Sequence, residues 1–458
     1  MDDQHIVPID EISGEGSSGH DQPAITMEME QRFSKLLDEG GKMGAALGTD
    51  HPPAKIQKVR VLLRDHKHFV KYFEPILVSL GPIHHGKPKY QLGEKHKLIL
   101  AYAFVQGCGC GESKKLLYMV KKEIKQLREC FEEEVTEKYD DETLAWMLFV
   151  DGCALLQYIF FATNDKLKEL NMKIDCVTFP LVQDLFLLEN QVPYGLLKLL
   201  MRYSGKEAEL SESIERFIGI IAYQPTNPQQ KHEQRDPTHL LDLLRTRLLG
   251  NRVQKEEESK ASSPDQSYRN VQELKSAGIQ LKRSKNNSYL RNISFTRKFG
   301  FYPGYLWLPP ITVDESTGTK FKNLIAYEMC PDFFNDFGIS SYIYFLDSLI
   351  DEVNDVKDMR KAHVLHNFLG SDQEVADLFN KIIGTDFVPN TGAYKDVKFQ
   401  IQKYYENSWM TWMSLFLHDH FNSPWTILAF LGVLLGLALT AAQTWLAIFP
   451  HLRDNAKK

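Results

Sequence analysis

Two glycine-rich segments have the spacing of nucleotide-binding loops. The first, Gly14-x-Gly16-x-x-Gly19, matches the dinucleotide pattern, which works only between a strand and a helix of a βαβ unit. Here it lies in an acidic stretch whose carboxylates would repel a pyrophosphate. The second, Gly81 to Lys87, matches a phosphate loop as far as Pro88, which replaces the Ser or Thr whose hydroxyl binds magnesium. We therefore expect no nucleotide cofactor at either segment.

Histidines cluster in one part of the chain and raise the question of a metal site. They are His66, His68, His84, His85 and His96. Zinc sites combine Cys and His at short, fixed spacings, and the nearby cysteines, Cys108 and Cys110, have no standard zinc spacing. We expect these histidines to form structural hydrogen bonds and predict no metal and no other cofactor.

Catalytic motifs are scarce as well. The sequence contains neither a G-x-S-x-G nucleophile elbow nor an H-E-x-x-H zinc motif. Acid–base catalysis needs carboxylates that converge in space, and a sequence does not show convergence. We predict that the protein is not an enzyme, with no catalytic residues, and keep a membrane-anchored enzyme of unknown reaction as the alternative.

A long apolar run near the C-terminus predicts a transmembrane helix over residues 425–449. These 25 residues carry no charge, and twelve of them are Leu, Ile, Phe or Val. A helix of that length spans about 37 Å, enough to cross a hydrocarbon core of about 30 Å. Trp425 and Trp445 lie near its ends, where aromatic rings favour the headgroup layer. We therefore expect a single-pass membrane protein with the lipid bilayer as a partner.

Small residues form a stripe along this predicted helix. Gly432, Gly436, Thr440 and Thr444 follow one another at steps of four residues. In lipid, helix association depends on close backbone approach, which small residues permit. The stripe predicts a homo- or heterodimer through the transmembrane helix.

The orientation of this helix stays open. A short tail, residues 450–458, favours post-translational insertion with the bulk of the chain in the cytosol. The basic residues of that tail favour the opposite arrangement by the positive-inside rule. The sequons at Asn286 and Asn292 are expected by chance and decide nothing. Residues 1–30 lack the apolar core of a signal peptide, and the plasma membrane is the favoured location.

A second apolar run, Leu144–Ala162, contains Asp151 at its centre. A central Asp costs about 2.5–3.5 kcal/mol in a membrane, so we predict a buried helix of the soluble part.

Charge and composition divide the rest of the 458 residues. Residues 1–54 hold eleven acidic and three basic residues and predict a flexible N-terminal arm of net charge −8. Because the whole chain has a net charge of −6, the remainder carries about +2, which argues against a nucleic-acid partner. Six cysteines are too few for a disulfide scaffold. Residues 55–421 have a globular composition, with an internal polar loop near 254–266.

Helical periodicity dominates residues 55–421. Ser371 to Glu374 is a capping-box pattern that begins a helix closed by Gly384. The leucines of His239–Leu249 predict a core helix, and Val397–Phe421 a further helix with the stripe Tyr405, Trp409, Trp412 and Phe416. Alternating β-branched and aromatic residues over 290–301 and 304–313 predict a minor β element. The fold class is mainly α: a large helical body with a minor β element and one C-terminal transmembrane helix.

Several segments in order resemble the plant domain-of-unknown-function 247 family. The stretch Tyr72–Gly86 is similar to that family's opening signature, in which Ile83 replaces the usual aromatic residue. Further matches are Asp151-Gly152-Cys153 (followed by Ala154 in place of Phe), Asp184–Pro193, His239–Leu243, Asn323–Glu328, Leu369–Asp372, Pro424-Trp425 and Gln443-Thr444. The similarity covers about residues 55–449.

The resemblance implies a plant protein with one C-terminal anchor and no assigned catalytic activity. Some members of the family are associated with self-incompatibility in grasses, which favours protein–protein recognition or signalling with an unknown protein partner. The Asp184–Pro193 segment has Leu185, Leu188 and Val192 on one predicted helical face, so we expect it to be buried and Glu189 and Asn190 to have partners inside the body.

Overall fold

The computed structural model describes residues 27–45, 55–64, 68–108, 113–170, 181–224, 236–250, 270–284, 289–297, 303–333, 336–383, 394–406 and 424–448. The chain divides into two units, Met1–Pro52 and Pro53–Lys458. The first unit contains helix α1 (Met27–Ala45), whose described side chains are exposed. The acidic glycine pattern at residues 14–19 and the polar loop near 254–266 lie outside the described residues.

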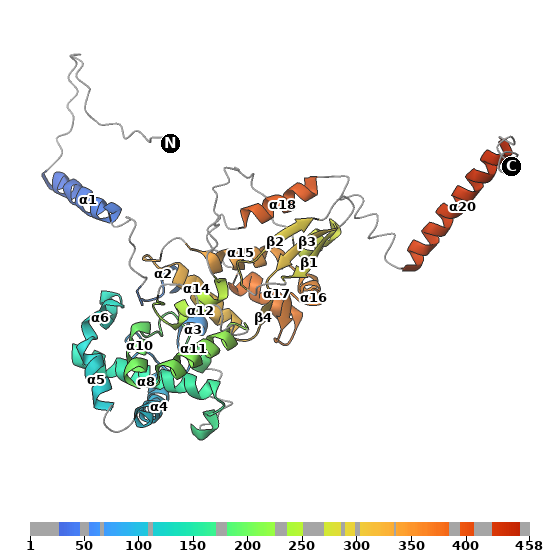
Figure 1. Cartoon of the computed structure of the whole chain (residues 1–458). Helices are drawn as coiled ribbons and strands as arrows, with labels where there is room; N and C mark the ends of the chain where they lie inside the picture. The colour runs from blue at the N-terminus through green and yellow to red at the C-terminus, as the bar shows by residue number, and fades with distance from the viewer. Residues whose placement is uncertain are drawn as a thin grey trace, which may run out of the picture. The chain divides into compact units, whose positions relative to one another are not determined.

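Helices build the first half of the second unit (Figure 1). They are α2 (Val61–Arg64), α3 (Phe69–Phe73), the 3₁₀ turn Pro88–Tyr90, α4 (Gln91–Gly107), α5 (Ser113–Lys122), α6 (Ile124–Glu129), α7 (Glu133–Thr136), α8 (Asp141–Thr163), the 3₁₀ turn Leu167–Leu170, α10 (Tyr194–Tyr203), α11 (Glu207–Ile221) and α12 (Leu240–Leu249). The last of these confirms the predicted core helix at His239–Leu249.

Helix α8 is the central element of this half. Asp140 caps its N-terminus, accepting a hydrogen bond from the Thr143 N–H at 2.7 Å. All residues from Leu144 to Ile159 except Trp146 are buried. Other parts of the protein cover nearly the whole helix, which explains why its residues are apolar on nearly every side. Helices α4, α5, α10 and α11 pack around it. The prediction of a buried helix at Leu144–Ala162 is confirmed.

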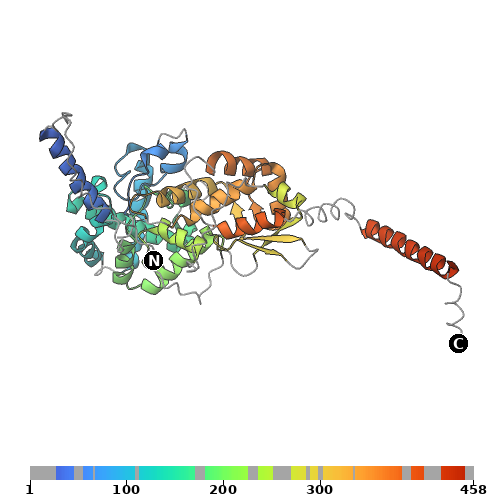
Figure 2. The ribbon, with the colours of Figure 1, turned by 90° about the horizontal axis from the view of Figure 1, so that it is seen from above.

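Two small sheets lie in the second half. In the first, β3 (Gly304–Leu308) pairs in parallel with β1 (Ile279–Arg283) and antiparallel with β2 (Ser294–Arg297). In the second, β4 (Ile311–Val313) pairs in parallel with β5 (Leu365–Asn367). The predicted minor β element is confirmed, although the sequence did not indicate β1 or β5. Figure 2 shows the yellow strands among the orange helices of the C-terminal half.

The remaining described helices lie in the C-terminal half of the chain. They are α13 (Val271–Ser276), α14 (Thr317–Glu328), α15 (Gly338–Leu349), α16 (Val353–Lys361), α17 (Asp372–Asp377), a π-helix (Leu378–Ile383), α18 (Lys395–Glu406) and α20 (Pro424–Ile448). The Ser371 hydroxyl caps α17 by accepting from the Glu374 N–H at 3.2 Å.

One predicted helix differs from the structure in type, and another is described only in part. The helix that follows Ser371 was expected to be α-helical to Gly384, but after Asp377 it becomes a π-helix, in which Asn380 donates to the Asp351 carbonyl at 2.9 Å. Of the predicted helix Val397–Phe421, only α18 is described. Tyr405 lies within it, while Trp409, Trp412 and Phe416 fall outside the described residues.

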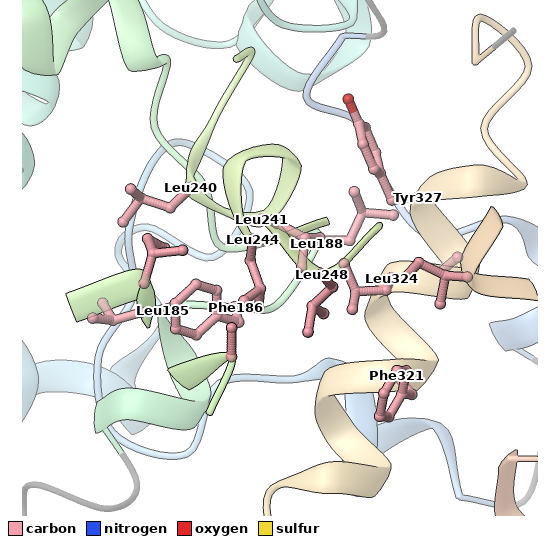
Figure 3. Packing of buried hydrophobic residues seen from close by; sticks show 14 of the residues in the cluster. Leu185, Phe186, Leu188, Leu240, Leu241, Leu244, Leu248, Phe321, Leu324 and Tyr327 are labelled. Carbon is pink, nitrogen blue, oxygen red and sulfur yellow. The ribbon is translucent and has the colours of Figure 1, made fainter. Parts of the chain in front are cut away.

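One hydrophobic core runs through the second unit. Figure 3 shows its centre, where leucines of α12 meet α14 and the segment that follows residue 184. Leu188, Leu241, Leu244 and Leu324 are each fully buried there. Three segments that are far apart in the sequence therefore share one core, and the buried polar side chains described next connect the same part of the protein.

Two described helices are long and apolar enough to cross a membrane: α8 and the Leu428–Trp445 part of α20. The two have equal mean hydropathy, but α8 is mostly buried, whereas the described side chains of α20 are exposed. Protein neighbours cover the apolar surface of α8 but leave that of α20 uncovered.

Candidate functional site

Asp184 holds an extended segment of the chain through its side chain. Its carboxylate accepts three backbone hydrogen bonds, from Ile76 at 2.7 Å and from Leu77 and Val78 at 2.8 Å. Burial raises the pKa of Asp184 to about 6, although these three N–H groups act in the opposite direction. The side chain is completely buried and ties Ile76–Val78 to the body.

The segment after Asp184 is buried but is not the helix that the spacing of its apolar residues predicted. Helical residues end at Asp184, and turns follow to residue 190. Polar side chains satisfy the carbonyls that a helix would have paired. Asn190 donates to the Asp184 carbonyl at 2.8 Å, and Gln191 donates to the carbonyls of Leu185 and Leu187, both at 2.8 Å. Local side-chain bonds therefore compete successfully with helix formation.

Asn190 and Gln191 also reach distant segments. Asn190 accepts from the Leu80 N–H at 2.7 Å and donates to the Val78 carbonyl at 3.0 Å. Gln191 accepts from the Leu241 N–H, at the start of α12, at 3.2 Å. The predicted partners of Asn190 inside the body are thus confirmed.

Glu189 is buried between a histidine and an arginine. Its Oε1 accepts from the Val59 N–H at 2.8 Å and from Arg64, and its Oε2 lies 3.1 Å from His84 Nε2. Burial alone would raise the pKa of Glu189, but His84, Arg64 and the Val59 N–H together hold it below its ordinary value. The Nδ1 of His84 lies 2.8 Å from the Lys87 ammonium. The expected partners of Glu189, and a structural role for His84, are confirmed.

Asp151 forms a buried ion pair with Lys97 at 2.6 Å. Its second oxygen accepts from the Gly81 N–H at 2.8 Å, and Lys97 also donates to the Ser79 carbonyl at 2.6 Å. Burial opposes the charge of Lys97, but Asp151 and Glu94 outweigh it and raise the pKa of the ammonium. The Gly81 N–H is the first donor of the segment that resembles a phosphate loop. In a phosphate loop this donor would bind a nucleotide, whereas here it binds the Asp151 carboxylate.

Asn323, on α14, connects three parts of the chain. Its amide nitrogen donates to the carbonyls of Tyr72 and Thr319, both at 2.8 Å, and its oxygen accepts from the Leu188 N–H at 2.9 Å. All four hydrogen-bonding positions of an amide need partners when the group is buried, and Asn323 is completely buried with three of them occupied.

A second ionic group joins α12, α14 and α15. Arg245 donates to Glu328 Oε1 at 2.8 Å and lies 3.2 Å from the carboxylate of Asp336. Glu328 in turn accepts from the N–H groups of Ile339 and Ser340, at 2.9 and 2.8 Å. A carboxylate at the N-terminus of α15 is favoured by the helix dipole. Burial alone would raise the pKa of Asp336, but Arg245 and Arg291 outweigh burial and lower this pKa below its ordinary value.

We call these residues the polar core. Its members are Lys97, Asp151, Asp184, Glu189, Asn190, Gln191, Arg245, Asn323 and Glu328. The sequence singled out the segment with Asp184, Glu189, Asn190 and Gln191, but it did not connect that segment with the other members, which lie far away along the chain. One indication was present: Asp151 interrupts an apolar run, and a buried carboxylate requires a partner.

The described hollows of the protein do not expose the polar core to a substrate. An enclosed cavity of about 20 Å³ beside Lys97 is lined mostly by apolar residues, including Val78, Leu100, Ala154 and Tyr158. An open hollow of about 380 Å³ lies between α5, α6 and α10, and another of about 550 Å³ lies beside β5. Among the described residues there is no group of three or more His, Cys, Asp or Glu that could hold a metal ion.

The predicted association stripe lies on α20. An added Cβ at Gly432 or Gly436 would meet no atom within 4 Å, so the backbone there is open to close approach. The hydroxyls of Thr440 and Thr444 donate to the carbonyls four residues earlier, at 2.8 and 2.9 Å. These hydroxyls therefore retain only acceptor capacity for a second helix. Asn292 is half-buried, and Asn286 lies outside the described residues.

Comparison with known proteins gives a consistent result. The model of a family described as a plant protein of unknown function, DUF247, matches residues 56–439. UPF0481 protein At3g47200 of Arabidopsis thaliana is 29% identical over 424 residues, which cover 84% of each chain. Putative UPF0481 protein At3g02645 of the same plant is 21% identical over 472 residues, covering 82% of this chain and 87% of the relative. No solved structure matches.

Proposed function

This chain belongs to the DUF247 family of plant proteins of unknown function, and from that premise we propose that it is a single-pass membrane-anchored protein that acts by binding another protein. The observation that carries the proposal is the uncovered apolar surface of α20. In water, 25 residues of this composition would be a strong aggregation hazard, whereas in a bilayer they satisfy the length and hydropathy of a spanning helix.

The polar core supports a non-catalytic role. Catalytic acids and bases act on groups that a substrate can reach, but the carboxylates of Asp151, Asp184 and Glu189 bond to backbone N–H groups and buried cations. These bonds fix the fold and leave the carboxylates little capacity for a ligand. An anchored enzyme of unknown reaction remains the second candidate, with the hollow between α5, α6 and α10 as its candidate site.

The type of recognition, the membrane in which the protein lies and its partners are further expectations. Recognition of the self-incompatibility type, the plasma membrane as location and the absence of a nucleic-acid partner stay predictions. A homo- or heterodimer through Gly432, Gly436, Thr440 and Thr444 is part of the same proposal.

The experiment is membrane extraction of the full chain, tagged at both ends and expressed in plant cells. We expect the protein to remain in the membrane pellet after alkaline carbonate treatment. The double variant Leu434→Arg/Leu435→Arg should become extractable, because each central arginine costs about 2.5–3.5 kcal/mol on insertion scales. Leu62→Arg, at an exposed position of α2, is the matched control and should stay in the pellet. Extraction of the unaltered protein by carbonate would refute anchoring.

A further inference from the structure

Helix α4 presents an apolar face that no described part of the protein covers. Leu92, Leu98, Ile99 and Tyr102 are between 49% and 65% exposed, and their spacing places them along one side of the helix. The opposite side, with Leu100, Ala101 and Phe104, is buried, and α4 packs closely against α8. Surface helices usually turn polar residues outward, so α4 departs from the normal pattern.

Lysines outnumber carboxylates in the stretch of chain that carries this face, although one of them, Lys97, is buried and paired with Asp151. From Phe69 to Gly107 the chain holds five lysines, no arginine and two glutamates, a net charge of 5 − 2 = +3, in a protein whose net charge is −6. Both glutamates are paired with lysines, Glu74 with Lys89 at 3.6 Å and Glu94 with Lys97 at 2.8 Å. Lys95 is exposed among the apolar residues of the face, and Lys87 and Lys89 are exposed just before the helix begins.

A further exposed apolar side chain lies on the segment that packs against the start of the helix. The backbone of Gly93 lies so close to Leu77 that an added Cβ would be 2.2 Å from the Leu77 carbonyl oxygen. The first turn of α4 therefore lies against the segment that contains Ile76, a further exposed apolar side chain. Asp184 and Asn190 fix this segment through its backbone, so the polar core holds the surface in a defined shape.

We propose that this face of α4 (Leu92, Lys95, Leu98, Ile99 and Tyr102) lies on the anionic lipid headgroups of the membrane that α20 enters. The inference rests on the proposed function, because α20 keeps the body near a bilayer. Apolar side chains with a lysine rim are the composition of helices that lie in the interface, where the apolar atoms enter the headgroup layer and the ammonium groups meet phosphates.

Charge complementarity selects the lipid and the side of the membrane. Anionic lipids are concentrated in the cytoplasmic leaflet and attract lysines that lie close to its surface. The body of the protein then lies in the cytosol. A protein partner would also cover an apolar face. Only an anionic surface would in addition favour a rim in which lysines are present and both glutamates are already paired.

The test is photocrosslinking in the full chain, reconstituted into vesicles in which every lipid carries a clickable tag, made of phosphatidylcholine either alone or mixed with phosphatidylserine. p-Benzoylphenylalanine replaces Tyr102 in one variant and Ile220, on α11, in the matched control; the two side chains are 65% and 57% exposed, but α11 holds four glutamates and no lysine. We expect a lipid adduct at position 102 and none at position 220. Adding Lys95→Glu to the Tyr102 variant should reduce the adduct in phosphatidylserine vesicles.

Equal lipid adducts at the two positions, or no lipid adduct at position 102, would overturn the inference. The experiment is then repeated in plant membranes, where an adduct at position 102 with protein and none with lipid would also overturn it. An adduct that does not depend on phosphatidylserine would refute the electrostatic argument. Carbonate extraction of the same samples separates the two proposals. If the chain is extracted, anchoring fails; if it stays in the pellet without a lipid adduct, only the contact of α4 fails.

Discussion

Asn323 donates a hydrogen bond to the carbonyl oxygen of Tyr72 across 251 residues of the chain, at 2.8 Å. The bond joins α14 to the end of α3, and the oxygen of the same amide accepts from Leu188. Because Asn323, Asp184 and Asp151 all bond to the stretch from Tyr72 to Gly81, that stretch is held at three points. Its residues resemble the family's opening signature, so the signature marks a structural clamp.

Removing the Asn323 side chain should destabilise the body strongly. Asn323→Ala leaves the Leu188 N–H and the Tyr72 carbonyl buried without partners, and each such group costs about 1–3 kcal/mol. We expect a loss of about 2–4 kcal/mol in the free energy of unfolding, measured by urea denaturation. Asn380→Ala, which removes one bond at the margin of the body, should cost less than about 1 kcal/mol. Equal losses in the two variants would contradict the clamp.

Glu189 should make stability depend on pH in a predictable direction. Its folded pKa lies below the ordinary value of 4.5, so the unfolded state binds the proton first as the pH falls. The stabilisation is present above about pH 4.5 and disappears as the pH falls through the folded pKa. Glu189→Gln should therefore be less stable than the unaltered protein at pH 7, and the difference should shrink below pH 4.5.

Glu142→Gln is the control for this titration. The Glu142 side chain is 82% exposed and pairs with Lys121 at the surface, where an ion pair contributes about 0–1 kcal/mol. Its unfolding free energy should follow that of the unaltered protein at every pH. If the free energies of unfolding of Glu189→Gln and the unaltered protein differed by the same amount from pH 7 to pH 3, the pH dependence attributed to Glu189 would be wrong.

Arg245 should be sensitive even to lysine. Arg245→Met leaves Glu328 as a buried charge without its cation, which costs about 3–5 kcal/mol. Arg245→Lys restores the charge but not the planar fork that contacts both Glu328 and Asp336, so we expect partial rescue. Lys121→Met, whose ion pair with Glu142 lies at the surface, should change the unfolding free energy by less than about 1 kcal/mol. Full rescue by lysine would contradict the geometric argument.

Deleting residues 1–54 should leave the melting temperature of the body nearly unchanged. The described side chains of α1 are exposed, and an acidic arm with little apolar surface does not repay the entropy of ordering. Lys55 should be kept, because its backbone N–H donates to Asp332 at 2.6 Å. Calorimetry of the two proteins in the same membrane-mimetic medium measures the effect, and a large decrease would show that the arm packs on the body.

The small-residue stripe should support association of α20 in lipid. Gly432→Ile/Gly436→Ile places branched side chains where the backbone is now open and should abolish dimerisation of the isolated helix in a membrane reporter assay. Leu435→Ile, on another face, is the control and should have no effect. A signal from the unaltered helix that is no higher than that of a monomeric standard would show that the stripe does not associate.

The sequence alone determined the features that depend on near neighbours along the chain. The leucines of His239–Leu249 predicted α12, and Ser371 predicted the N-terminus of α17, because helix formation and capping involve residues within a few positions. Asp151 correctly distinguished the buried α8 from α20, since a single central carboxylate changes the cost of membrane insertion.

Only the tertiary structure decided how the polar core is assembled. The turns after Asp184 replace a helix because Asn190 and Gln191 bond to local carbonyls and to Leu80 and Leu241 at the same time. The parallel pairing of β1 with β3 and the contact between Asn323 and Tyr72 likewise join residues far apart in the sequence. Such contacts depend on how the whole core packs, and residue spacing carries no information about them.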